Sequence, residues 1–474
     1  VSATAFANLC WTQAWLPWLL LAWQAATAPD SRHRLAATGG LALVGALMVS
    51  LGDPFVLGAG LLALLFLSCS EALRRIREQE AGLFPLVGPP LAALLVALLL
   101  ASPFLIAFRA YAPSSMRALG FNPQGVLVWS LHPAMALDLL LPGPFGDPDL
   151  EGLGGFWARA TAPEKGFSLF RGLYLGPLAL GLALLGALRR WPARWAMLLL
   201  LGLLALLALG GHGPLYTRLS GLPFFSSLRF PAKWILPALL PLALLAGSGV
   251  RAVQESPTGG PVRRRALALF LLLGGLLAIL SLAPSTGLDG WLIGLAGEGA
   301  ASLGPESLRV MRGDFVLAVG WAFIPLLLGA ALVWAGGRRT PRWIALMLAL
   351  LVSIDLGLAN RRLAPTVPAA FYTDVPASAR TLDTGPEPRG RVWVEDPWAA
   401  AVKLVPPPER LVDRFRWQRR ALMGYVGAAH GLDLAFPKDT EQFAPVDYTR
   451  LRVIVESAPP REKSMLLGAA GVTH

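Results

Sequence analysis

Charged residues and cysteines are scarce in this chain. Asp, Glu, Lys and Arg make up only 15% of its 474 residues, whereas soluble proteins contain about 25%. The two cysteines, Cys10 and Cys69, fall toward opposite faces of the expected membrane topology, so no disulfide is expected. The chain also lacks a P-loop, a Rossmann glycine fingerprint, a His-Glu-x-x-His motif and a Cys or His set with metal-ligand spacing. These absences argue against a soluble protein, nucleotide-driven transport and structural zinc.

Long apolar stretches are what the chain has instead. Hydrophobic residues make up 55% of the sequence, and ten separate stretches approach the roughly 17 to 25 residues needed to cross about 30 Å of hydrocarbon. We expect transmembrane helices at 6–27, 35–51, 54–70, 83–103, 172–188, 193–210, 234–250, 266–283, 315–336 and 343–359. The sequence therefore predicts an all-α polytopic membrane protein with about ten spans.

Basic residues occupy alternate connections between these stretches. The connections after the first, third, fifth, seventh and ninth stretches carry Arg32 and Arg34; Arg74, Arg75 and Arg77; Arg189, Arg190 and Arg194; Arg251 and Arg263 to Arg265; and Arg338, Arg339 and Arg342. By the positive-inside rule these connections face the cytoplasm, so both ends of the chain would lie outside a bacterial cytoplasmic membrane. The net charge of +12 then reflects anchoring near anionic headgroups rather than nucleic-acid binding.

The chain divides into a membrane domain, residues 1–359, and a polar tail, residues 360–474. The membrane domain has three long outer loops, 104–171, 211–233 and 284–314, and a tight Gly52-Asp53-Pro54 turn between the second and third stretches. An outside N-terminus normally follows an odd number of earlier spans, and Val1 is not preceded by a signal-like basic segment. We therefore expect the chain to begin partway through a longer protein, a start at a non-Met codon being the alternative.

The tail is expected to form a small extracytoplasmic α/β domain. Its segments 391–395 and 451–456 alternate or run apolar like short strands, while 408–423 contains helix formers. Residues 465–468 read like a helix that leads into a strand near the end of the chain.

Several short motifs, taken in order, resemble bacterial YfhO-type membrane proteins, which are similar to GT-C glycosyltransferases. The most specific is the outer segment Gly213-Pro214-Leu215-Tyr216, Leu222-Pro223-Phe224-Phe225 and Leu228-Arg229-Phe230-Pro231-Ala232-Lys233, which resembles that family's Leu-Pro, Phe-Arg, Pro and basic-residue signature before a span. The other matches are Asn8-Leu9, Ala14-Trp15-Leu16-Pro17-Trp18, Gly52-Asp53-Pro54, Pro103, Ser114-Ser115-Met116-Arg117, Leu141-Pro142, Phe145-Gly146, Asp355-Leu356, Asn360 and Pro365-Thr366. The family more often has a small-His-Pro turn where this chain has Gly52-Asp53-Pro54, so a direct role of that turn stays open.

The resemblance implies an enzyme whose base lies elsewhere. GT-C enzymes carry a catalytic carboxylate in the first extracytoplasmic loop and take sugars from polyprenyl-phosphate donors at the outer face. This chain is expected to start after that loop. We therefore assign no catalytic residue within it.

Arg229 and Lys233 are the leading candidates for binding a lipid phosphate. They are four residues apart, and Pro231 between them favours a helix start. In a helix they would share one face at headgroup height, where Arg presents a planar fork of donors to phosphate oxygens. The alternative is that both side chains only reach toward lipid headgroups.

Five further residues are candidates with simpler alternatives. His212 would donate to phosphate or relay protons, or be merely solvated, and Asp53 would act in the site or only shape its turn. Arg109 and Arg117 would line a donor path or anchor to headgroups. Asp355 lies inside the last expected span near its outer end. Ionisable residues within a membrane are functional by default, but the closeness of Asp355 to water weakens that interpretation.

An acidic stretch of the first long loop completes the candidates. His132, Asp138, Asp147, Asp149 and Glu151 lie there, with an interfacial helix expected around 126–141. Paired carboxylates would suit Mg²⁺ or Ca²⁺, but an acidic surface is the simpler interpretation. We expect no cofactor and no resident metal.

These features favour a membrane glycosyltransferase that moves a sugar from a polyprenyl-phosphate carrier to a cell-envelope glycan or lipid on the outer face. Its partners would be the lipid bilayer, the lipid-linked sugar and the acceptor, and not nucleic acid. The alternative is a non-catalytic carrier, flippase or assembly partner in polysaccharide export. Transporters tend to have broken helices, mid-membrane charges and detectable halves. This chain has its ionisable residues at the outer edge and no obvious halves, which favours surface chemistry.

Overall fold

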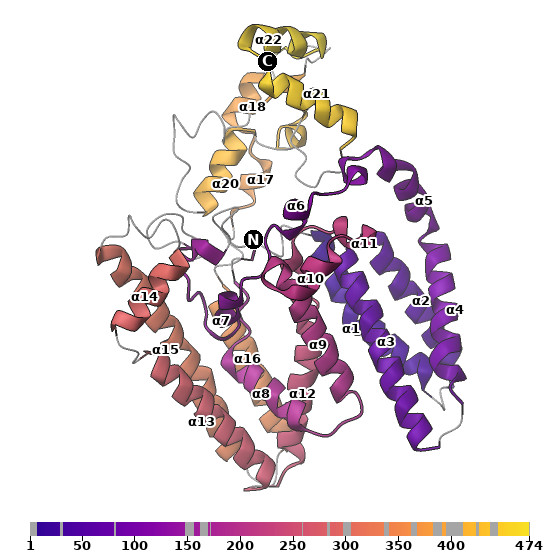
Figure 1. Ribbon diagram of the computed structural model, residues 1–474, viewed down its shortest axis with the longest axis vertical. Helices are drawn as coiled ribbons and strands as arrows, with labels where there is room; N and C mark the ends of the chain where they lie inside the picture. Colours follow the sequence, from indigo (N-terminus) through magenta and orange to yellow (C-terminus); the bar gives the residue numbers. More distant parts are fainter. Residues whose placement is uncertain are drawn as a thin grey trace. The chain divides into compact units, whose positions relative to one another are not determined.

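Helices make up most of the structure (Figure 1). The computed structural model describes residues 7–28, 32–79, 82–146, 156–161, 169–170, 172–257, 259–281, 285–296, 305–335, 341–361, 367–382, 391–394, 411–422, 426–436 and 444–473. The chain divides into two compact units. The first comprises Val1–Ile106, Asn122–Pro148 and Leu153–Ala364, and the second comprises Ala107–Phe121, Asp149–Gly152 and Pro365–His474. A piece of the outer loop expected at 104–171 thus belongs with the tail.

Five helices in the described residues are long and apolar enough to cross a membrane. They are α2 (Arg34–Leu51), α3 (Pro54–Arg77), the segment Pro231–Glu255, α15 (Pro305–Ala335) and the Arg342–Ala359 part of α16 (Pro341–Ala359). A sixth span results if α4 (Phe84–Leu100) and the following helical segment Ser102–Ser114, bent from it by 60°, count as one. The chain is therefore a multi-pass membrane protein, but the expectation of about ten spans is wrong.

Several expected spans form helices that are too short or too polar. The α8 helix (Pro177–Leu188) has 12 residues and α9 (Arg194–Ala208) has 15, and at about 1.5 Å per residue neither reaches about 30 Å. The α1 helix (Ala7–Thr27) interrupts its apolar residues with Thr12, Gln13 and Gln24, and α13 (Pro261–Ser281) begins with three arginines. Hydropathy along the sequence does not report where a helix starts. Residues before Pro177, for example, leave the helical path because Leu175 and Gly176 donate to the Leu139 carbonyl, each at 3.1 Å.

The Gly52-Asp53-Pro54 turn joins α2 to α3 as expected. Gly52 adopts a left-handed conformation with φ 71°, and its N–H bonds the Met48 and Val49 carbonyls to end α2. Asp53 then accepts from the Phe55 and Val56 N–H groups and caps α3, with Pro54 in the first turn. Three adjacent residues therefore stop one helix and start the next.

The first unit contains two helix groups that pack side by side (Figure 1). One consists of α1 to α4 around Leu16, Met48 and Val56. The other consists of α8, α12 (Leu239–Glu255), α13, α15 and α16 around Leu178, Phe270 and Phe315. The α8 and α12 helices approach very closely, since a Cβ on Gly186 would lie 1.8 Å from the Leu245 carbonyl oxygen and one on Gly249 would lie 2.0 Å from that of Leu182. Small residues permit such backbone contact between helices in membranes.

Short elements form the connections of the first unit. They are α6 (Pro123–Leu127), η3 (Pro133–Ala136), α7 (Leu137–Leu140), η4 (Arg159–Thr161), η5 (Gly210–His212), α10 (Pro214–Leu219), α11 (Pro223–Ser226), η6 (Pro231–Ile235) and α14 (Ser285–Ala296). The single interfacial helix expected around 126–141 is thus three short pieces: residues 128–132 separate α6 from η3, and α7 follows η3 directly. The expected loop 284–314 contains α14 and the first turns of α15.

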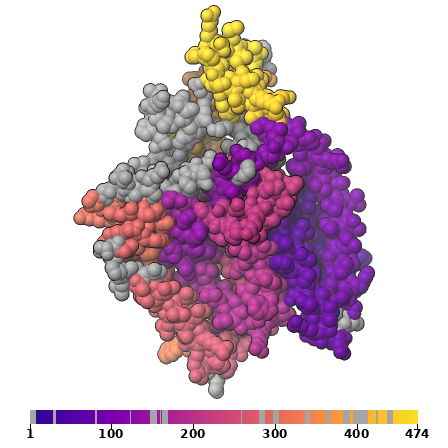
Figure 2. Space-filling model, in the orientation of Figure 1, coloured from indigo at the N-terminus to yellow at the C-terminus, as the bar shows by residue number. Residues whose placement is uncertain are grey.

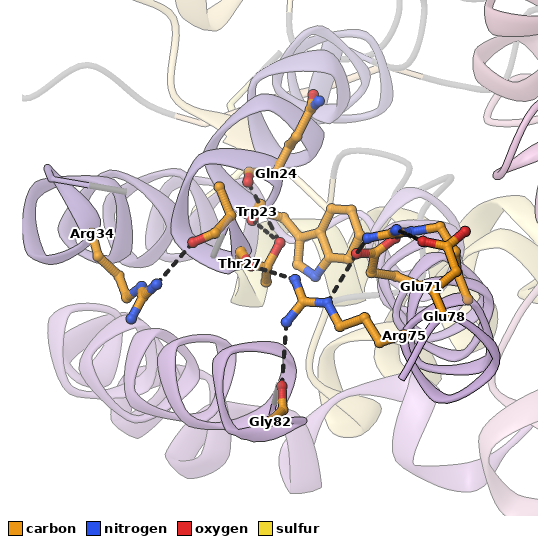
Figure 3. A network of polar contacts seen from close by, with 10 residues as sticks. Trp23, Gln24, Thr27, Arg34, Glu71, Arg75, Glu78 and Gly82 are labelled. Carbon is orange, nitrogen blue, oxygen red and sulfur yellow. Dashed lines mark hydrogen bonds and ion pairs between the residues drawn. The ribbon is translucent and has the colours of Figure 1, made fainter. Parts of the chain in front are cut away.

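A buried arginine ties together the connections at the last turn of α3 (Figure 3). Arg75 is 2% exposed and donates through Nη2 to the Thr27 carbonyl at 2.9 Å, through Nε to Glu71 at 3.0 Å and through Nη1 to the Gly82 carbonyl at 3.4 Å. Arg74 on the same turn pairs with Glu71 and Glu78. Arg75 therefore joins the end of α1, the end of α3 and the loop before α4, rather than anchoring to headgroups.

The second unit includes most of the tail and is mainly helical. Its elements are the end of α5 (Ser102–Tyr111), η1 (Ala112–Ser114), η2 (Met116–Leu119), α17 (Ala370–Thr373), α18 (Ala377–Leu382), β1 (Val392–Trp393), α20 (Leu411–Arg420), η9 (Ala428–His430), β2 (Leu434–Ala435), α21 (Val446–Ser457) and α22 (Pro460–Ala469). β1 pairs with β2 in parallel, and Arg391 beside it bridges to Val472. Segment 107–121 joins this unit through a bond from the Met116 N–H to the Ala444 carbonyl at 3.1 Å.

The tail expectations are confirmed in part. The strand expected at 391–395 contains β1, and the helix formers of 408–423 build α20. The strand expected at 451–456 is wrong, because these residues lie in α21. The Arg452–Glu456 ion pair, 2.7 Å long at i,i+4 spacing, stabilises a helix there, and only Val455 of the apolar run is buried. The helix at 465–468 is α22, and Val472 just after it forms the bridge to Arg391.

Candidate lipid-phosphate site

A buried carboxylate marks the start of α3. Asp53 is 1% exposed, and its Oδ1 accepts from the Phe55 N–H at 3.1 Å and the Val56 N–H at 3.0 Å. Burial raises the pKa of Asp53, while these two N–H groups and the nearby charge of Lys233 oppose the rise. Asp53 is thus both a helix cap and the acidic neighbour of a buried cation.

Lys233 is that cation, and it lies beneath aromatic rings. It is 7% exposed, and its Nζ is 5.3 Å from the centre of the Phe230 ring and 5.7 Å from that of Phe55. Ring faces attract a desolvated ammonium, and the attraction is stronger than in water. The expectation that Lys233 shares one helical face with Arg229 is wrong, because η6 begins at Pro231 and Arg229 lies before it.

Two strained residues shape the chain beside Lys233. Phe230 has φ 70° and Trp129 has φ 55°, values that bulky side chains rarely adopt. Their rings meet edge to face with centroids 4.6 Å apart, and the Ala232 N–H bonds the Trp129 carbonyl at 3.2 Å. Strain of this kind persists only where the surroundings hold it, and it gathers at functional sites.

Arg229 is the half-buried cation of this cluster. Its guanidinium carbon lies 4.5 Å from the centre of the Phe230 ring. Stacking on the ring limits the orientations of the guanidinium plane, which is the group that would hold phosphate oxygens. Of the two leading candidates, Arg229 is therefore the more accessible and Lys233 the more enclosed.

A histidine pair lies on the neighbouring loops. His132 and His212 meet edge to face with ring centroids 4.9 Å apart. The Ala134 N–H donates to His132 Nδ1 at 3.2 Å, so the proton of neutral His132 sits on Nε2. Burial lowers the pKa of His132, and the charge of His212 lowers it further. Both effects disfavour the charged form of His132, which lies beside the exposed His212.

Ser130 fixes this histidine pair to the rest of the cluster. Its hydroxyl accepts from the Gly211 N–H at 2.8 Å and donates to the Leu127 carbonyl at 2.6 Å, while the Leu131 N–H bonds the Ala208 carbonyl at 2.9 Å. Trp129, which contacts Phe230, is the adjacent residue. A continuous chain of contacts therefore leads from Asp53 through Lys233 and Phe230 to the two histidines.

Asp355 has a different role from these residues. It accepts from the Tyr174 hydroxyl at 3.0 and 2.9 Å on its two oxygens and from Trp321 Nε1 at 3.0 Å. Asp138, expected on an acidic surface loop, is instead buried and accepts from the Leu173 N–H at 2.6 Å. Both carboxylates therefore bind residues of the segment before α8: Asp138 binds the backbone N–H of Leu173, and Asp355 binds the Tyr174 side chain.

The structure does not assign the remaining candidates to this cluster. Arg109 and Arg117 belong to the second compact unit. Asp147, Asp149 and Glu151 lie outside the described residues. Within the described residues, no group of three or more His, Cys, Asp or Glu side chains is arranged to hold a metal ion.

The sequence therefore identified some members of the cluster and missed others. Asp53, His212, Arg229 and Lys233 are brought into one cluster, whereas the pairing of His132 with His212 and the strain at Trp129 and Phe230 were not expected. A positive φ at a bulky residue leaves no mark in the sequence. No protein-family model matches the chain, and neither the curated proteins nor the solved structures provide a match.

Proposed function

We propose that this chain forms part of a membrane glycosyltransferase that transfers a sugar from a polyprenyl-phosphate donor to a cell-envelope glycan or lipid. The observation that carries the proposal is the cluster at the start of α3 and of the Pro231–Glu255 segment. There an Arg guanidinium stacked on an aromatic ring lies beside a buried Lys and a neutral His paired with a second His. Cations and N–H donors beside a long apolar helix match the chemistry of a phosphate with a lipid tail.

The reaction would be a displacement at the anomeric carbon of the donor sugar. The acceptor hydroxyl loses its proton to a base and its oxygen bonds the anomeric carbon, while the bond from that carbon to the phosphate oxygen breaks. The lipid phosphate leaves with the electron pair of that bond. Arg229 would hold the phosphate oxygens as negative charge develops, and buried Lys233 would add positive potential. We assign the role of base to none of the clustered residues.

We infer that this chemistry takes place at the outer face. The α3 helix has Asp53 as its N-cap and Arg74, Arg75 and Arg77 in its last turn. By the positive-inside rule the arginine end would face the cytoplasm of a bacterial cell, and the cluster at the other end would face outward. A polyprenyl carrier would lay its tail along the apolar helices and its phosphate at the cluster.

A carrier or flippase that binds the same lipid without chemistry is the second candidate. The 60° bend between α4 and the following helical segment supports it, because broken helices are common where transporters bind their substrates. Binding of the lipid without turnover by the complete protein would favour this candidate.

The test replaces Arg229 in the complete protein reconstituted in liposomes. We expect Arg229→Ala to slow consumption of the polyprenyl-phosphate sugar by about 30- to 1,000-fold, and Arg229→Lys to restore only part of the rate because Lys lacks the planar fork. Arg218→Ala, which removes an exposed arginine from the nearby α10, is the matched control and should retain the parent rate. A folded Arg229→Ala protein with the parent rate would rule out this role for Arg229.

A further inference from the structure

A groove at the other end of α3 is not used by the proposed function. It has a volume of about 630 Å³ and lies between the last turns of α3 and the residues that begin α9. α3 and α9 pack against each other (Figure 1), and in the space-filling view the purple atoms of the N-terminal helices adjoin the magenta atoms of the segment around residue 200 (Figure 2). The groove belongs to the first unit alone.

The groove carries positive charge that the described part of the chain does not neutralise. Four arginines line it, and the lining contains one acidic residue, Glu78. Arg74 is already bound to Glu71 and Glu78. The other three arginines, Arg77, Arg190 and Arg194, form no ion pair with a described residue, and Arg194 stacks on Trp195 at 4.6 Å from the ring centre. The site therefore matches a ligand with more than one negative charge or with several acceptor oxygens.

The remaining lining is apolar and aromatic. Leu73 is 56% exposed and Leu199 is 60% exposed, and both face the groove, so apolar surface continues outward from the arginines. Trp191 also lines the groove, with its ring N–H donated to the Gly186 carbonyl at 3.2 Å. Amphipathic Trp rings beside arginines at the end of a membrane-spanning helix mark the depth of lipid headgroups. A soluble anion would leave the apolar surface of the groove uncovered.

We propose that this groove binds an anionic phospholipid, with Arg77, Arg190 and Arg194 around its phosphate and its acyl chains along Leu73 and Leu199. The charge and the apolar surface together select this occupant, since basic pockets between helices at the cytoplasmic side bind anionic headgroups. The proposal does not depend on the glycosyltransferase function.

The test is a lipid titration of the complete chain in neutral detergent, with bound lipid counted by native mass spectrometry. The parent should bind phosphatidylglycerol more tightly than phosphatidylcholine. At about 5-fold per arginine, the triple variant Arg77→Ala, Arg190→Ala, Arg194→Ala should raise the Kd for phosphatidylglycerol by about 100-fold and leave that for phosphatidylcholine unchanged. If the triple variant does not fold, Arg190→Gln alone should raise it by about 5-fold.

A matched control removes the same charge elsewhere. Arg32, Arg265 and Arg342 are exposed arginines on other basic connections, and their triple Ala variant should change the Kd by less than about 3-fold. An equal loss in both triple variants would show general attraction and overturn the proposal, as would an unchanged preference in the groove variant. Displacement of the lipid by glycerol phosphate at similar concentration would overturn the assignment to a lipid.

The thiol of Cys69 can report whether a lipid occupies the groove. It is exposed and lines the groove, and Cys10→Ser leaves it as the single cysteine. In nanodiscs, phosphatidylglycerol should slow its alkylation relative to phosphatidylcholine alone, and the groove variant should abolish the difference. Equal alkylation rates of the parent in the two lipids would place the lipid elsewhere and overturn the proposal.

Discussion

The two ends of α3 each carry a buried cation, and the two cations are held in different ways. In the last turn, Arg75 donates three hydrogen bonds to a carboxylate and two carbonyls that belong to three separate connections. Beside the first turn, Lys233 lies over two aromatic rings with Asp53 near it. Because α3 has 24 residues and is about 36 Å long, the two environments are independent.

The difference separates a structural cation from a candidate functional one. Directional bonds from a guanidinium fix three pieces of backbone relative to one another, which suits an anchor. Ring faces and a nearby charge stabilise an ammonium in a way that depends less on its orientation than hydrogen bonds do. Such an environment suits a cation whose electric field acts on a ligand. Positive φ occurs at both ends, at Gln79 just after α3 and at Trp129 and Phe230 beside Lys233, but only the Lys233 end has it at bulky aromatic residues.

Removing Arg75 should give the largest loss of stability. Arg75→Ala leaves the Thr27 and Gly82 carbonyls without this donor, while Glu71 keeps Arg74 as a partner, so we expect the free energy of unfolding to fall by about 2 to 4 kcal/mol. Denaturant titration of the detergent-solubilised protein measures it. Arg77→Ala, on the same turn but exposed, should change it by no more than about 0.5 kcal/mol. Equal effects of the two variants would show that Arg75 is not an anchor.

A buried carboxyl group, that of Asp138, sharpens the comparison. Burial raises the pKa of Asp138 to about 7, although the N–H groups of Leu173 and Gly143 oppose the rise. The folded state therefore holds a proton that the unfolded state releases near pH 4, so the free energy of unfolding should fall as the pH rises toward about 7, by a few kcal/mol at most.

Asp138→Asn should remove this pH dependence, because the amide does not titrate. The measurement is denaturant titration at pH 5, 6, 7 and 8. It is combined with hydrogen exchange of the Leu173 amide, which donates a hydrogen bond to Asp138. A parent protein that gains stability from pH 5 to pH 7 to a greater extent than Asp138→Asn would contradict the raised pKa.

The smallest expected effect is the coupling between Asp53 and Lys233. In a double-mutant cycle with Asp53→Asn and Lys233→Met, we expect a coupling energy of about 1 to 2 kcal/mol, because both groups are buried. The exposed pair Arg251–Glu255, 2.6 Å apart on α12, is the control and should show a smaller coupling energy, because solvent screens it. A coupling no larger than that of the control would mean that Asp53 does not stabilise Lys233.

Local features of the fold could be predicted because they depend on neighbouring residues. In the Gly52-Asp53-Pro54 turn, Gly52 ends α2 in a left-handed conformation, Asp53 caps α3 and Pro54 occupies its first turn. Pro231 likewise occupies the first turn of η6. The multi-pass class follows from apolar runs alone. The number of spans does not, since α8 and α9 are shortened by contacts and caps that hydropathy does not report.

The amino-acid sequence by itself determined that this is a helical membrane protein, that Asp53 caps a turn and that Arg229 and Lys233 precede a long apolar helix. Only the tertiary structure decided that Lys233 is enclosed by Phe55 and Phe230, that His132 meets His212 and that Arg75 is an anchor. Caps and apolar runs act within a few residues along the chain. The environment of a buried charge is built from segments far apart in sequence, and folding alone brings them together.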